Sequence, residues 1–452
     1  MAAGSGILFC SPNPMSLIEK VRLAGVVGAG GGGFPSHVKL SAKADTVIAN
    51  GAECEPLMHK DAAVMETMAA DVVRGMELCM VATGAADGII GIKAKKKGAV
   101  KAIEAACAGT KVRVHLLGDF YPAGDEYDLV YSVTGRLIPP AGIPINVGVV
   151  VTNVETLVNI ANAADGKPVT HKTLTVAGAV RNPVTITVPI GVSFRDCIEA
   201  AGGATTDNPV LCLGGLMMGE TTDDLDRPVT KTATGVVVLP RNHHVIERKL
   251  KTPTTKAKIG KSACDQCRYC TELCPRFLLG YQVEPHQVMR SLAFTGTGTE
   301  RWNEWASLCC SCGLCTLYAC PEELYPKEAC DDAKTAMRQA NYKWAGKTDV
   351  KVHPMRDGRH VPIKSLVKKL HVGEYDVPAP MTNIELPVKQ IHLPLKQSAG
   401  APCVAVVKVG DTVQAGQAVA EPAPKALGAI IHSPFAATVS DVTSDRITLI
   451  KK

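Results

Sequence analysis

Residues 264–275 read CDQCRYCTELCP and place four cysteines within twelve residues, with a proline directly behind the last of them. A second run, CCSCGLCTLYACP, follows at residues 309–321 and also ends on Cys-Pro. Nine of the 17 cysteines thus fall between positions 264 and 320, at intervals too short for a framework of disulfides. The stretch MAAGSGILFCSPNP has no basic lead before its short apolar part, so we expect a cytoplasmic protein without a secretory signal. In the reducing cytosol, thiols gathered in this way indicate metal or redox chemistry.

The spacing within the two runs predicts two iron–sulfur clusters rather than a zinc site. A Cys-x2-Cys-x2-Cys loop brings three thiolates to three irons of one cubane, while a fourth cysteine followed by proline turns away to a second cluster. Both runs have this form, so each completes the cluster of the other. Zinc, the alternative, favours separated Cys-x2-Cys pairs. The predicted ligands are Cys264, Cys267, Cys270 and Cys320 for one [4Fe–4S] cluster, and Cys309, Cys312, Cys315 and Cys274 for the other.

The second run departs from the first in two places. Cys310 is a ninth thiol in the region, and four residues rather than three precede Cys320. The spare thiol is either a bystander or a ligand that exchanges with its neighbours, and the sequence leaves both open. The eight cysteines outside this region are scattered, and each is expected to be a small buried apolar side chain. His286, between the runs, is expected to be a packed or surface histidine rather than a ligand.

The composition of the chain argues against a nucleic-acid partner and against membrane insertion. The chain has 452 residues, 46% apolar content and a net charge of +6, which does not call for nucleic acid as a partner. Its longest apolar runs have about ten residues, whereas a membrane helix needs about 20, so no membrane insertion is expected. Two lysine-rich stretches, 93–101 and 248–261, are expected to be a solvated face and a solvated tether, with a docking site as the alternative for each.

A glycine tract, GVVGAGGGGFP at residues 25–35, follows a segment in which the apolar residues from Leu17 to Leu23 fall near one face of a helix. Glycines permit positive φ and let backbone amides approach a ligand closely. Amides that converge in such a loop form an anion nest, with a flexible turn as the alternative. The loop is not a P-loop, because no Gly-Lys-Ser/Thr follows. It is not a standard Rossmann fingerprint, because a helix rather than a strand precedes it.

Polar side chains follow the next apolar segment. Residues 46–49 read as a short buried strand, and Asn50, Glu53 and Glu55 come soon after it. In α/β sheets, ligands bind at the carboxyl ends of the strands. Carboxylates at that place suit hydrogen bonds to ribose hydroxyls or to a flavin ring rather than to phosphate. Residues 88–119 then read as strand, helix and strand, which predicts a parallel sheet.

Four motifs make a resemblance specific: GAGGGGFPSHVK at 28–39, NGAECEP at 50–56, YPAGDE at 121–126 and TNVETL at 152–157. In this order they resemble the flavin-binding fold shared by the NADH-oxidising subunit of respiratory complex I and the C subunit of Rnf-type ferredoxin:NAD oxidoreductases. The resemblance implies that this part of the chain binds FMN and NADH.

The same resemblance implies a role for each group of residues. The glycine loop and Lys39 hold the FMN phosphate and ring edge, and Phe34 stacks on the nicotinamide nucleotide. The polar residues after the strand line the flavin and NADH site, those of the third motif shape the pocket, and those of the fourth close over the flavin. The residues implied in cofactor binding are Gly28, Gly30, Gly31, Gly33, Phe34, Lys39, Asn50, Glu53, Glu55, Tyr121, Asp125, Glu126, Asn153 and Thr156.

Two further modules complete the predicted organisation. Residues 171–215 read as strand, Asn-Pro turn, strand and helix, and resemble the soluble-ligand-binding β-grasp module of the same flavoproteins. The tail from about residue 385 resembles a biotinyl/lipoyl carrier, but Lys425 lacks a carrier's sequence context, so a structural module is expected. The predicted fold is multidomain: an α/β domain for FMN and NADH at 1–165, a β-grasp domain at 166–247, a ferredoxin-like helical two-cluster domain at 248–345, and a linker with a C-terminal β-sandwich of the lipoyl-like hybrid type at 346–452.

The order of these modules narrows the resemblance. Rnf C subunits carry a similar hybrid module at the N-terminus, whereas a module placed last resembles the cobalamin reductase family of propanediol-utilisation microcompartments. This resemblance implies that electrons pass from NADH through FMN and two clusters to cob(III)alamin or cob(II)alamin, so that adenosylcobalamin can be regenerated for propanediol degradation. Its implied partners are an adenosyltransferase and shell proteins inside a bacterial microcompartment.

Electron transfer of this kind leaves the chemistry to the cofactors, so no catalytic side chain is predicted. Two alternatives remain: an Rnf-like NADH/ferredoxin electron-transfer subunit of a membrane complex, and a non-catalytic electron-relay scaffold.

Overall fold

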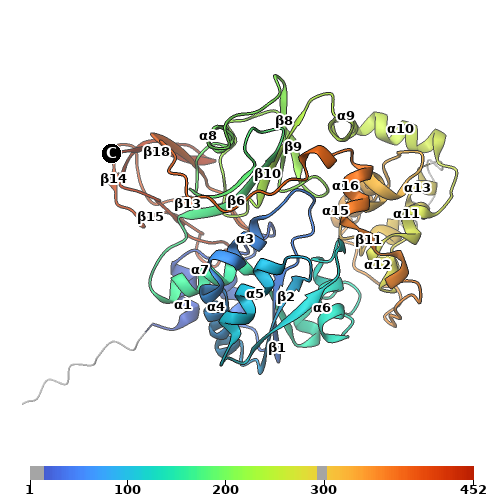
Figure 1. Cartoon of the computed structure of the whole chain (residues 1–452), viewed down its shortest axis with the longest axis horizontal. Coiled ribbons are helices and arrows are strands. Elements are labelled where there is room, and N and C mark those ends of the chain that lie inside the picture. The colour runs from blue at the N-terminus through green and yellow to red at the C-terminus, as the bar shows by residue number, and fades with distance from the viewer. Residues whose placement is uncertain (1–14, 293–302) are drawn as a thin grey trace, which may run out of the picture.

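The computed structural model describes residues 15–292 and 303–452. Cys10 and the end of the apolar segment between the cysteine runs lie outside the described residues. In Figure 1 the C-terminal strands lie at one end of the long axis and the helices of residues 253–339 at the other. Two larger sheets lie between these ends, one above the other.

The first sheet is parallel and has helices on both faces, as the alternation of strand and helix predicted. Its strands and helices are β1 Thr46–Gly51, β2 Asp87–Lys93, β3 Val112–Leu117, β5 Val149–Asn153, α1 Leu17–Leu23, α2 Ser36–Leu40, α3 Lys60–Thr67, α4 Ala69–Thr83, α5 Lys97–Cys107, α6 Glu126–Thr134 and α7 Val154–Ala164. The strand order is β3-β2-β1-β5. Val47 and Ala49 of β1 pack with α4, α5 and α7, whereas Ile48 packs with α6. Because both faces are covered, the apolar residues Val47, Ile48 and Ala49 follow one another without polar residues between them.

The second sheet confirms the predicted strand, turn, strand and helix from residue 171. Its elements are β6 His171–Gly178, β7 Val184–Pro189, α8 Phe194–Ala200, β8 Pro209–Leu213, β9 Glu220–Thr222 and β10 Gly235–Pro240. The strand order is β7-β6-β10-β8-β9, in which only β6 and β10 run parallel. Ser193 caps α8 by accepting a hydrogen bond from the amide of Asp196 at 3.0 Å.

The segment around the cysteine runs is helical, and the tether expected at 248–261 is wrong. The helices are α9 His244–Leu250, α10 Pro253–Ala263, α11 Tyr269–Glu272, α12 Pro275–Leu278, α13 Pro285–Ser291 and α15 Pro326–Gln339. Thr252 caps α10 by accepting a hydrogen bond from the amide of Thr255 at 3.2 Å, and Pro253 takes the first helical position. Lys256 then donates to the carbonyl of Lys249 at 3.0 Å and lies 5.3 Å from the ring centre of Tyr325. The stretch is therefore helical and not a flexible tether: Lys249 and Lys256 are half-buried along protein surface, whereas Lys251, Lys258 and Lys261 are exposed, as expected.

The C-terminal part folds back on the rest of the chain before it forms its own strands. Its elements, with their partner β4 Phe120–Tyr121, are β11 Val361–Pro362, α16 Ile363–Lys369, β12 Gln390–Pro394, β13 Val404–Ala405, β14 Thr412–Val413, β15 Ala418–Glu421, β16 Ile431–His432, β17 Ala437–Val442 and β18 Arg446–Lys451. β11 pairs with β4 of the first unit. The later strands form two small sheets, β12-β18-β17-β14 and β13-β15-β16.

A buried lysine joins three of these units. Lys231, between the second-sheet strands, is 2% exposed, and its ammonium nitrogen donates to the carbonyls of Gly25 at 2.7 Å and Ile430 at 2.6 Å. Its backbone amide donates to Gln397 at 3.2 Å. Burial lowers the pKa of Lys231 to about 7. In its neutral form the amine of Lys231 has two hydrogens, one for each of the two carbonyl oxygens.

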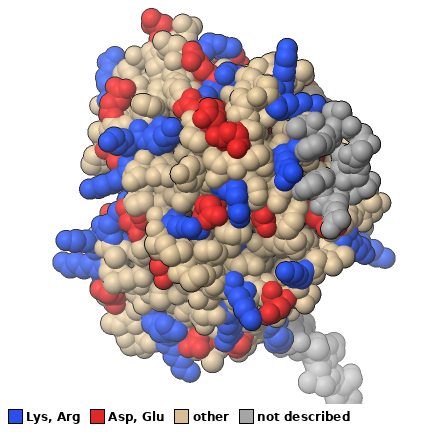
Figure 2. Space-filling model, turned by 90° about the vertical axis from the view of Figure 1, so that its right-hand side faces the viewer, with Lys and Arg blue, Asp and Glu red and all other residues tan. Residues whose placement is uncertain are grey.

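The lysines at 93–101 lie only partly on a solvated face. Lys95, Lys97 and Lys101 are exposed, as expected. Lys93 is 1% exposed, because it ends the buried strand β2, and it pairs with Asp119 at 3.2 Å. Figure 2 shows the end of the molecule that carries α10 to α15, where basic and acidic side chains are interspersed with uncharged surface. Among the described residues, no helix is long and apolar enough to cross a bilayer.

Candidate functional site

A cavity of about 830 Å³ lies at the carboxyl ends of β1 and β5, between the parallel sheet and the second sheet. Its wall also includes residues 213–235 of the second sheet and two cysteines of the cluster segment, Cys310 and Cys312. The predicted site residues that line it are Gly28, Gly30, Gly31, Gly33, Phe34, Lys39, Asn50, Glu53, Glu55, Asp125, Glu126, Asn153 and Thr156. Three distant parts of the chain thus share one space.

The glycine loop presents free amides to this cavity. The amide of Gly28 donates to the carbonyl of Phe34 at 3.0 Å, and the amide of Gly33 donates back to Gly28 at 3.2 Å, so the loop is closed on itself. Gly31 has φ +110° and has no neighbour within 4 Å of a Cβ built on it. Between these closing bonds, the amides of Gly30, Gly31 and Gly32 donate to no group of the described residues. Unpaired amides on an open glycine loop fit a phosphate group.

Two side chains fix the loop from behind. The amide of Ala29 donates to the hydroxyl oxygen of Thr156 at 2.9 Å, and the carbonyl of Ala29 accepts from Lys172 at 3.0 Å. Thr156 and Lys172 are both about 1% exposed. Lys172 comes from β6 of the second sheet, so the position of the loop depends on contacts between two units.

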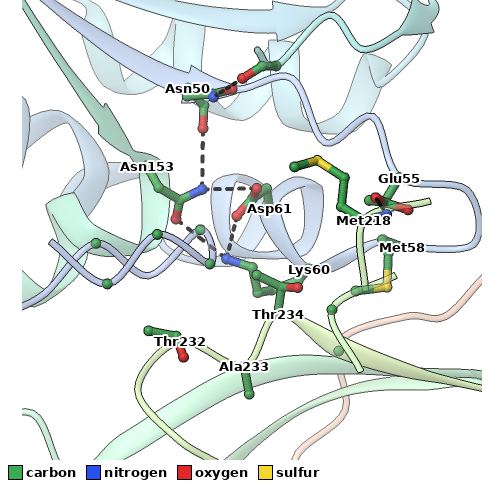
Figure 3. Close-up of a pocket in the computed structure, with 18 of the residues that line it drawn as sticks. Asn50, Glu55, Met58, Lys60, Asp61, Asn153, Met218, Thr232, Ala233 and Thr234 are labelled. Atoms are coloured by element: carbon green, nitrogen blue, oxygen red, sulfur yellow. Dashed lines mark hydrogen bonds and ion pairs between the residues drawn. The ribbon is translucent and has the colours of Figure 1, made fainter. Parts of the chain in front are cut away.

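A network of charged and amide groups lies at the cavity, and Figure 3 shows its members Lys60, Asp61 and Asn153. The ammonium group of Lys60 is 2.6 Å from a carboxylate oxygen of Asp61 and 2.9 Å from one of Glu155. Asn153 donates to the other oxygen of Asp61 at 3.0 Å. Glu155 also accepts from Lys172, so two cations share its carboxylate.

The shared carboxylate sets the protonation of this network. Burial opposes charge on all of these groups. For Lys60, the carboxylates of Asp61 and Glu155 more than offset burial and raise its pKa. For Glu155, Lys172 and Lys60 more than offset burial and lower its pKa. For Lys172, burial prevails over the attraction of Glu155 and lowers the pKa to about 8. Lys60 and Glu155 therefore stay charged near neutral pH.

The two glutamates of the NGAECEP motif are held by backbone amides. Glu53 accepts from the amide of Asp61 at 2.6 Å, at the start of α3. Glu55 accepts from the amides of Met217 and Met218 in the second unit, each at 2.9 Å. Burial is the main cause that raises the pKa of both glutamates. Glu53 thus supports one element of the cavity wall, and Glu55 joins the two units that enclose it.

Two other predicted residues, Lys39 and Asn50, place polar side chains at the cavity wall. Lys39 donates to the carbonyl of Val151 at 3.0 Å and lies 3.6 Å from Glu126, with both side chains partly exposed. Asn50 donates to the carbonyl of Gly124 at 2.9 Å, which fixes its amide at the end of β1. Polar groups that converge on an otherwise apolar space are typical of a cofactor site.

Four of the eight predicted ligand thiols surround one small space, and the other four interact electrostatically with one another. One small cavity is lined together by Cys264, Cys267, Cys270 and Cys320. His286 lines the same cavity but shares a hydrogen bond with the hydroxyl of Thr271 at 2.8 Å. No group of three or more His, Cys, Asp or Glu in the described ranges is arranged to hold one metal ion. In a cubane each thiolate binds a different iron, so its ligands surround a volume instead of converging on a point.

The second group of thiols lies against the first unit. Cys274 and Cys309 pack in one apolar cluster with Tyr127, and Cys312 packs in another with Tyr121. Tyr121 does not line the cavity; it is 2% exposed and donates its hydroxyl to the carbonyl of Cys312 at 2.6 Å.

Asp125, which precedes α6, also reaches the cluster segment. It pairs with Arg276 at 2.8 Å, just after the Cys274-Pro275 corner. Tyr121 and Asp125 therefore join the YPAGDE motif to the cysteine runs.

Several residues of the site were missed from the sequence. Lys60 and Lys172 are lysines in the core, and sequence patterns favour the surface for lysine. The spare thiol of Cys310 lines the cavity and contacts the thiol of Cys312, and this contact is the main cause that raises the pKa of Cys312. Cys330, expected to be a buried bystander, is buried but contacts Cys309 and lowers the pKa of that thiol to about 7. The one local signal for Lys60 was its position directly before Asp61, the carboxylate with which it pairs.

Four family descriptions match successive parts of the chain. They are the Nuo51 FMN-binding domain at residues 21–162, the SLBB domain at 173–221, the 4Fe-4S dicluster domain at 263–325 and the RnfC barrel sandwich hybrid domain at 367–452. Together with the cavity and the thiols, they define an electron-transfer oxidoreductase with an FMN-binding domain and a 4Fe–4S dicluster domain.

Curated relatives identify the branch of this class. The chain is 42% identical to the cobalamin reductase PduS of Citrobacter freundii and to that of Salmonella typhimurium, over 96% of this chain and 96% of each relative. It is 38% identical to the C subunit of the Na(+)-translocating ferredoxin:NAD(+) oxidoreductase complex of Acetobacterium woodii, over 57% of each chain. The chain belongs to the cobalamin reductase PduS family.

Proposed function

We propose that this chain oxidises NADH and passes its electrons singly, through FMN and two [4Fe–4S] clusters, to cobalamin. The observation that carries the proposal is the shared cavity, whose wall joins the glycine loop to Cys312. A nucleotide-type site and a thiol loop in one space suit a transfer from flavin to cluster. The relatives that match 96% of the chain are named cobalamin reductases, which supports cobalamin as the acceptor. The balanced reaction is NADH + 2 cob(III)alamin → NAD⁺ + H⁺ + 2 cob(II)alamin.

The residues of the chain bind and orient the groups that react. A bound flavin takes two electrons as hydride and releases them one by one, and each cluster carries one electron. The amides of Gly30, Gly31 and Gly32 bind the phosphate of FMN, and Lys39 adds a positive charge at the same wall. Phe34, partly buried in the cavity wall, stacks on the nicotinamide nucleotide.

The remaining residues assigned to the site shape the cavity and hold its walls in place. Glu53 and Glu55 bring the walls of the cavity together. Asn50 and Asn153 line the cavity at the ends of β1 and β5, where their amides hold its wall in place through bonds to Gly124 and Asp61. Thr156 holds the glycine loop in place. No side chain is required to act as a general acid or base.

The biological setting follows from the same family. A cobalamin reductase supplies reduced cobalamin to an adenosyltransferase, so that enzyme is the proposed partner. We place the chain in the cytoplasm, inside a propanediol-utilisation microcompartment with a protein shell. The proposed domain limits are 1–165, 166–247, 248–345 and 346–452.

Anaerobic purification followed by iron, sulfide and flavin analysis tests the cofactors. NADH-driven reduction of cob(III)alamin, with NADPH and oxidised ferredoxin as alternative substrates, tests the route. Cys267→Ala is expected to lose roughly half of the iron while flavin stays bound and is still bleached by NADH. Cys107→Ala, a change at a thiol far from the runs, is the matched control and is expected to keep all of the iron. Unchanged iron in Cys267→Ala, or a protein without flavin, would contradict the assignment.

A further inference from the structure

We infer that the two clusters have a fixed order in the relay, with one set of thiols at the cavity and the other at the surface. The inner set is Cys274, Cys309, Cys312 and Cys315, and the outer set is Cys264, Cys267, Cys270 and Cys320. Electrons enter the cluster segment at the inner set and leave it at the outer set. The direction of electron flow and the identity of donor and acceptor rest on the proposed function, but the placement of one set at the cavity and the other at the surface does not.

The wall of the cavity contains part of the inner set. Cys312 lines the cavity beside the spare thiol of Cys310, whereas no thiol of the outer set lines it. Tyr121 holds the Cys312 loop from the side of the flavin-binding unit, through its 2.6 Å bond to the Cys312 carbonyl. Pro122, the next residue, is itself part of the cavity wall. Two consecutive residues, Tyr121 and Pro122, thus connect the loop of the inner set to the wall of the cavity.

The apolar packing separates the two sets in the same way. Cys312 packs with Leu57 and Met58, which precede α3 of the flavin-binding unit. Cys274 packs in a cluster that includes Tyr127 of α6. By contrast, Cys264 and Cys320 pack in a cluster whose members all fall within residues 259–342. Cys309 of the inner set also borders that last cluster. Cys274 and Cys312 of the inner set are therefore packed against the flavin-binding unit, whereas Cys264 and Cys320 of the outer set pack within the cluster segment alone.

Exposure supplies the third, independent observation. Of the eight predicted ligands, Cys267 is the exposed one, and the other seven are buried or half-buried. Its neighbours Arg268 and Tyr269 are exposed as well. The outer set therefore lies under a solvent-accessible loop. Figure 2 shows that basic and acidic side chains are mixed over this end of the molecule.

These observations favour one route because electron transfer slows steeply with distance. Cys274, Cys309, Cys312 and Cys315 would hold the cluster that takes one electron from the flavin cavity and gives it to the cluster held by Cys264, Cys267, Cys270 and Cys320. The acceptor would take that electron at the Cys267 loop, which would leave both clusters in their starting state. Two such passages balance the oxidation of one NADH.

A pair of ligand variants tests the order. Cys312→Ser disturbs the inner cluster and Cys267→Ser the outer one, and both are prepared anaerobically with excess FMN. Each is reduced either with NADH, which enters at the flavin, or with photogenerated methyl viologen radical, which enters from solvent. Stopped-flow absorbance follows the flavin, and freeze-quench electron paramagnetic resonance follows the clusters.

The two variants should respond in opposite ways. In Cys267→Ser, NADH should reduce the flavin and the inner cluster at the wild-type rate, while cobalamin reduction falls at least tenfold. In Cys312→Ser, NADH should reduce the flavin but leave the outer cluster oxidised on the time scale of turnover, whereas methyl viologen radical should still reduce that cluster. NADH-driven reduction of the outer cluster in Cys312→Ser at the wild-type rate would overturn the order.

A milder change covers the case in which a ligand variant does not fold. Tyr121→Phe removes only the hydroxyl that bonds to Cys312, so it should shift one of the two cluster resonances. A soluble paramagnetic chelate should broaden the other resonance, because the outer cluster is nearer to solvent. If the chelate acts most strongly on the resonance that Tyr121→Phe shifts, the order is wrong. Failure of cobalamin reduction with a correct order would instead refute only the proposed acceptor.

Discussion

The contact between Asp125 and Arg276 offers the sharpest test of how the cluster segment is held against the flavin-binding unit. The two side chains are each 10% exposed and 2.8 Å apart. The guanidinium group also lies 3.6 Å from the ring centre of Tyr127. Arg276→Met removes the cation, keeps most of the apolar stem, and leaves the carboxylate of Asp125 buried without its partner.

The expected cost follows from that burial. Removal of one partner of a buried ion pair costs about 3–5 kcal/mol, because the remaining charge is uncompensated. We take the lower end, about 3 kcal/mol, since both side chains keep some contact with water. A change of 1 kcal/mol shifts the melting temperature of a unit of 150–250 residues by about 2–4 °C, so Arg276→Met should melt about 6–12 °C below wild type.

The matched control is Arg195→Met. Arg195 donates two hydrogen bonds to the carboxylate of Asp226, at 2.8 and 2.9 Å. The two side chains are 47% and 67% exposed, so this ion pair lies at the surface. An exposed pair of this kind contributes about 0.2–1 kcal/mol. Thermal unfolding under anaerobic conditions, at one scan rate and followed by cluster absorbance and flavin fluorescence, compares the two variants.

A second change separates electrostatics from packing. In the double variant Arg276→Met/Asp125→Asn the buried charge is gone, so stability should recover relative to Arg276→Met alone. Asparagine can still cap α6, because it can accept the bond that Asp125 takes from the amide of Asp128. If the double variant melts below the single one, or if Arg276→Met melts no lower than Arg195→Met, the reasoning is refuted.

Two further predictions concern the junctions between units. Burial lowers the pKa of Lys231 to about 7. Above pH 7 the folded state therefore binds fewer protons than the unfolded state, in which this lysine has its ordinary pKa. The free energy of unfolding should then rise by up to about 1.4 kcal/mol per pH unit until the pH reaches that ordinary lysine pKa. Burial lowers the pKa of His432 to about 3 and raises that of Cys403, so these neighbours stay neutral, and the melting temperature of wild type should climb relative to Lys231→Met between pH 7 and 9. A Cβ on Gly75 would lie 2.1 Å from a backbone oxygen of α7, whereas one on Gly84, at φ +77°, meets nothing within 4 Å. Gly75→Ala should therefore lower the melting temperature at least twice as much as Gly84→Ala, and equal losses would contradict the close approach of α4 and α7.

Much of the architecture could be predicted because its signals are local. The thiol spacing, the glycine tract and the alternation of strand and helix each depend on residues near one another in the chain. The cavity shows the limit of such signals: Glu55 was assigned to the flavin site, and it does line the cavity, but its carboxylate accepts from amides at 217 and 218. That partner lies about 160 residues away, and no local pattern indicates it.

The buried lysines were missed for a related reason. Lysine is among the residues least often buried, so a sequence alone favours the surface for it. Lys60, Lys172 and Lys231 are buried because carboxylates or carbonyls distant in the sequence meet their ammonium groups, in the same unit for Lys60 and in other units for the other two. The basic stretch around Lys256 was likewise expected to be solvated, and the aromatic ring that covers it comes from residue 325. Long-range pairing, rather than composition, decides where these side chains lie.

The cavity is assembled from three units, and this couples cofactor binding to docking. A ligand that binds only the docked arrangement stabilises it in proportion to its own affinity, and any contact that favours docking tightens the ligand in return. Cys274 and Cys312 of the inner thiol set lie in the docking interface, whereas Cys264 and Cys320 of the outer set do not. Loss of the inner cluster in Cys312→Ala should therefore weaken FMN binding, while loss of the outer cluster in Cys267→Ala should leave it unchanged. Titration of flavin-stripped protein with FMN, followed by fluorescence quenching, measures both affinities. Unchanged FMN affinity in Cys312→Ala would mean that FMN binding does not depend on the inner set, and equal weakening in the two variants would mean that the two sets do not differ in this respect.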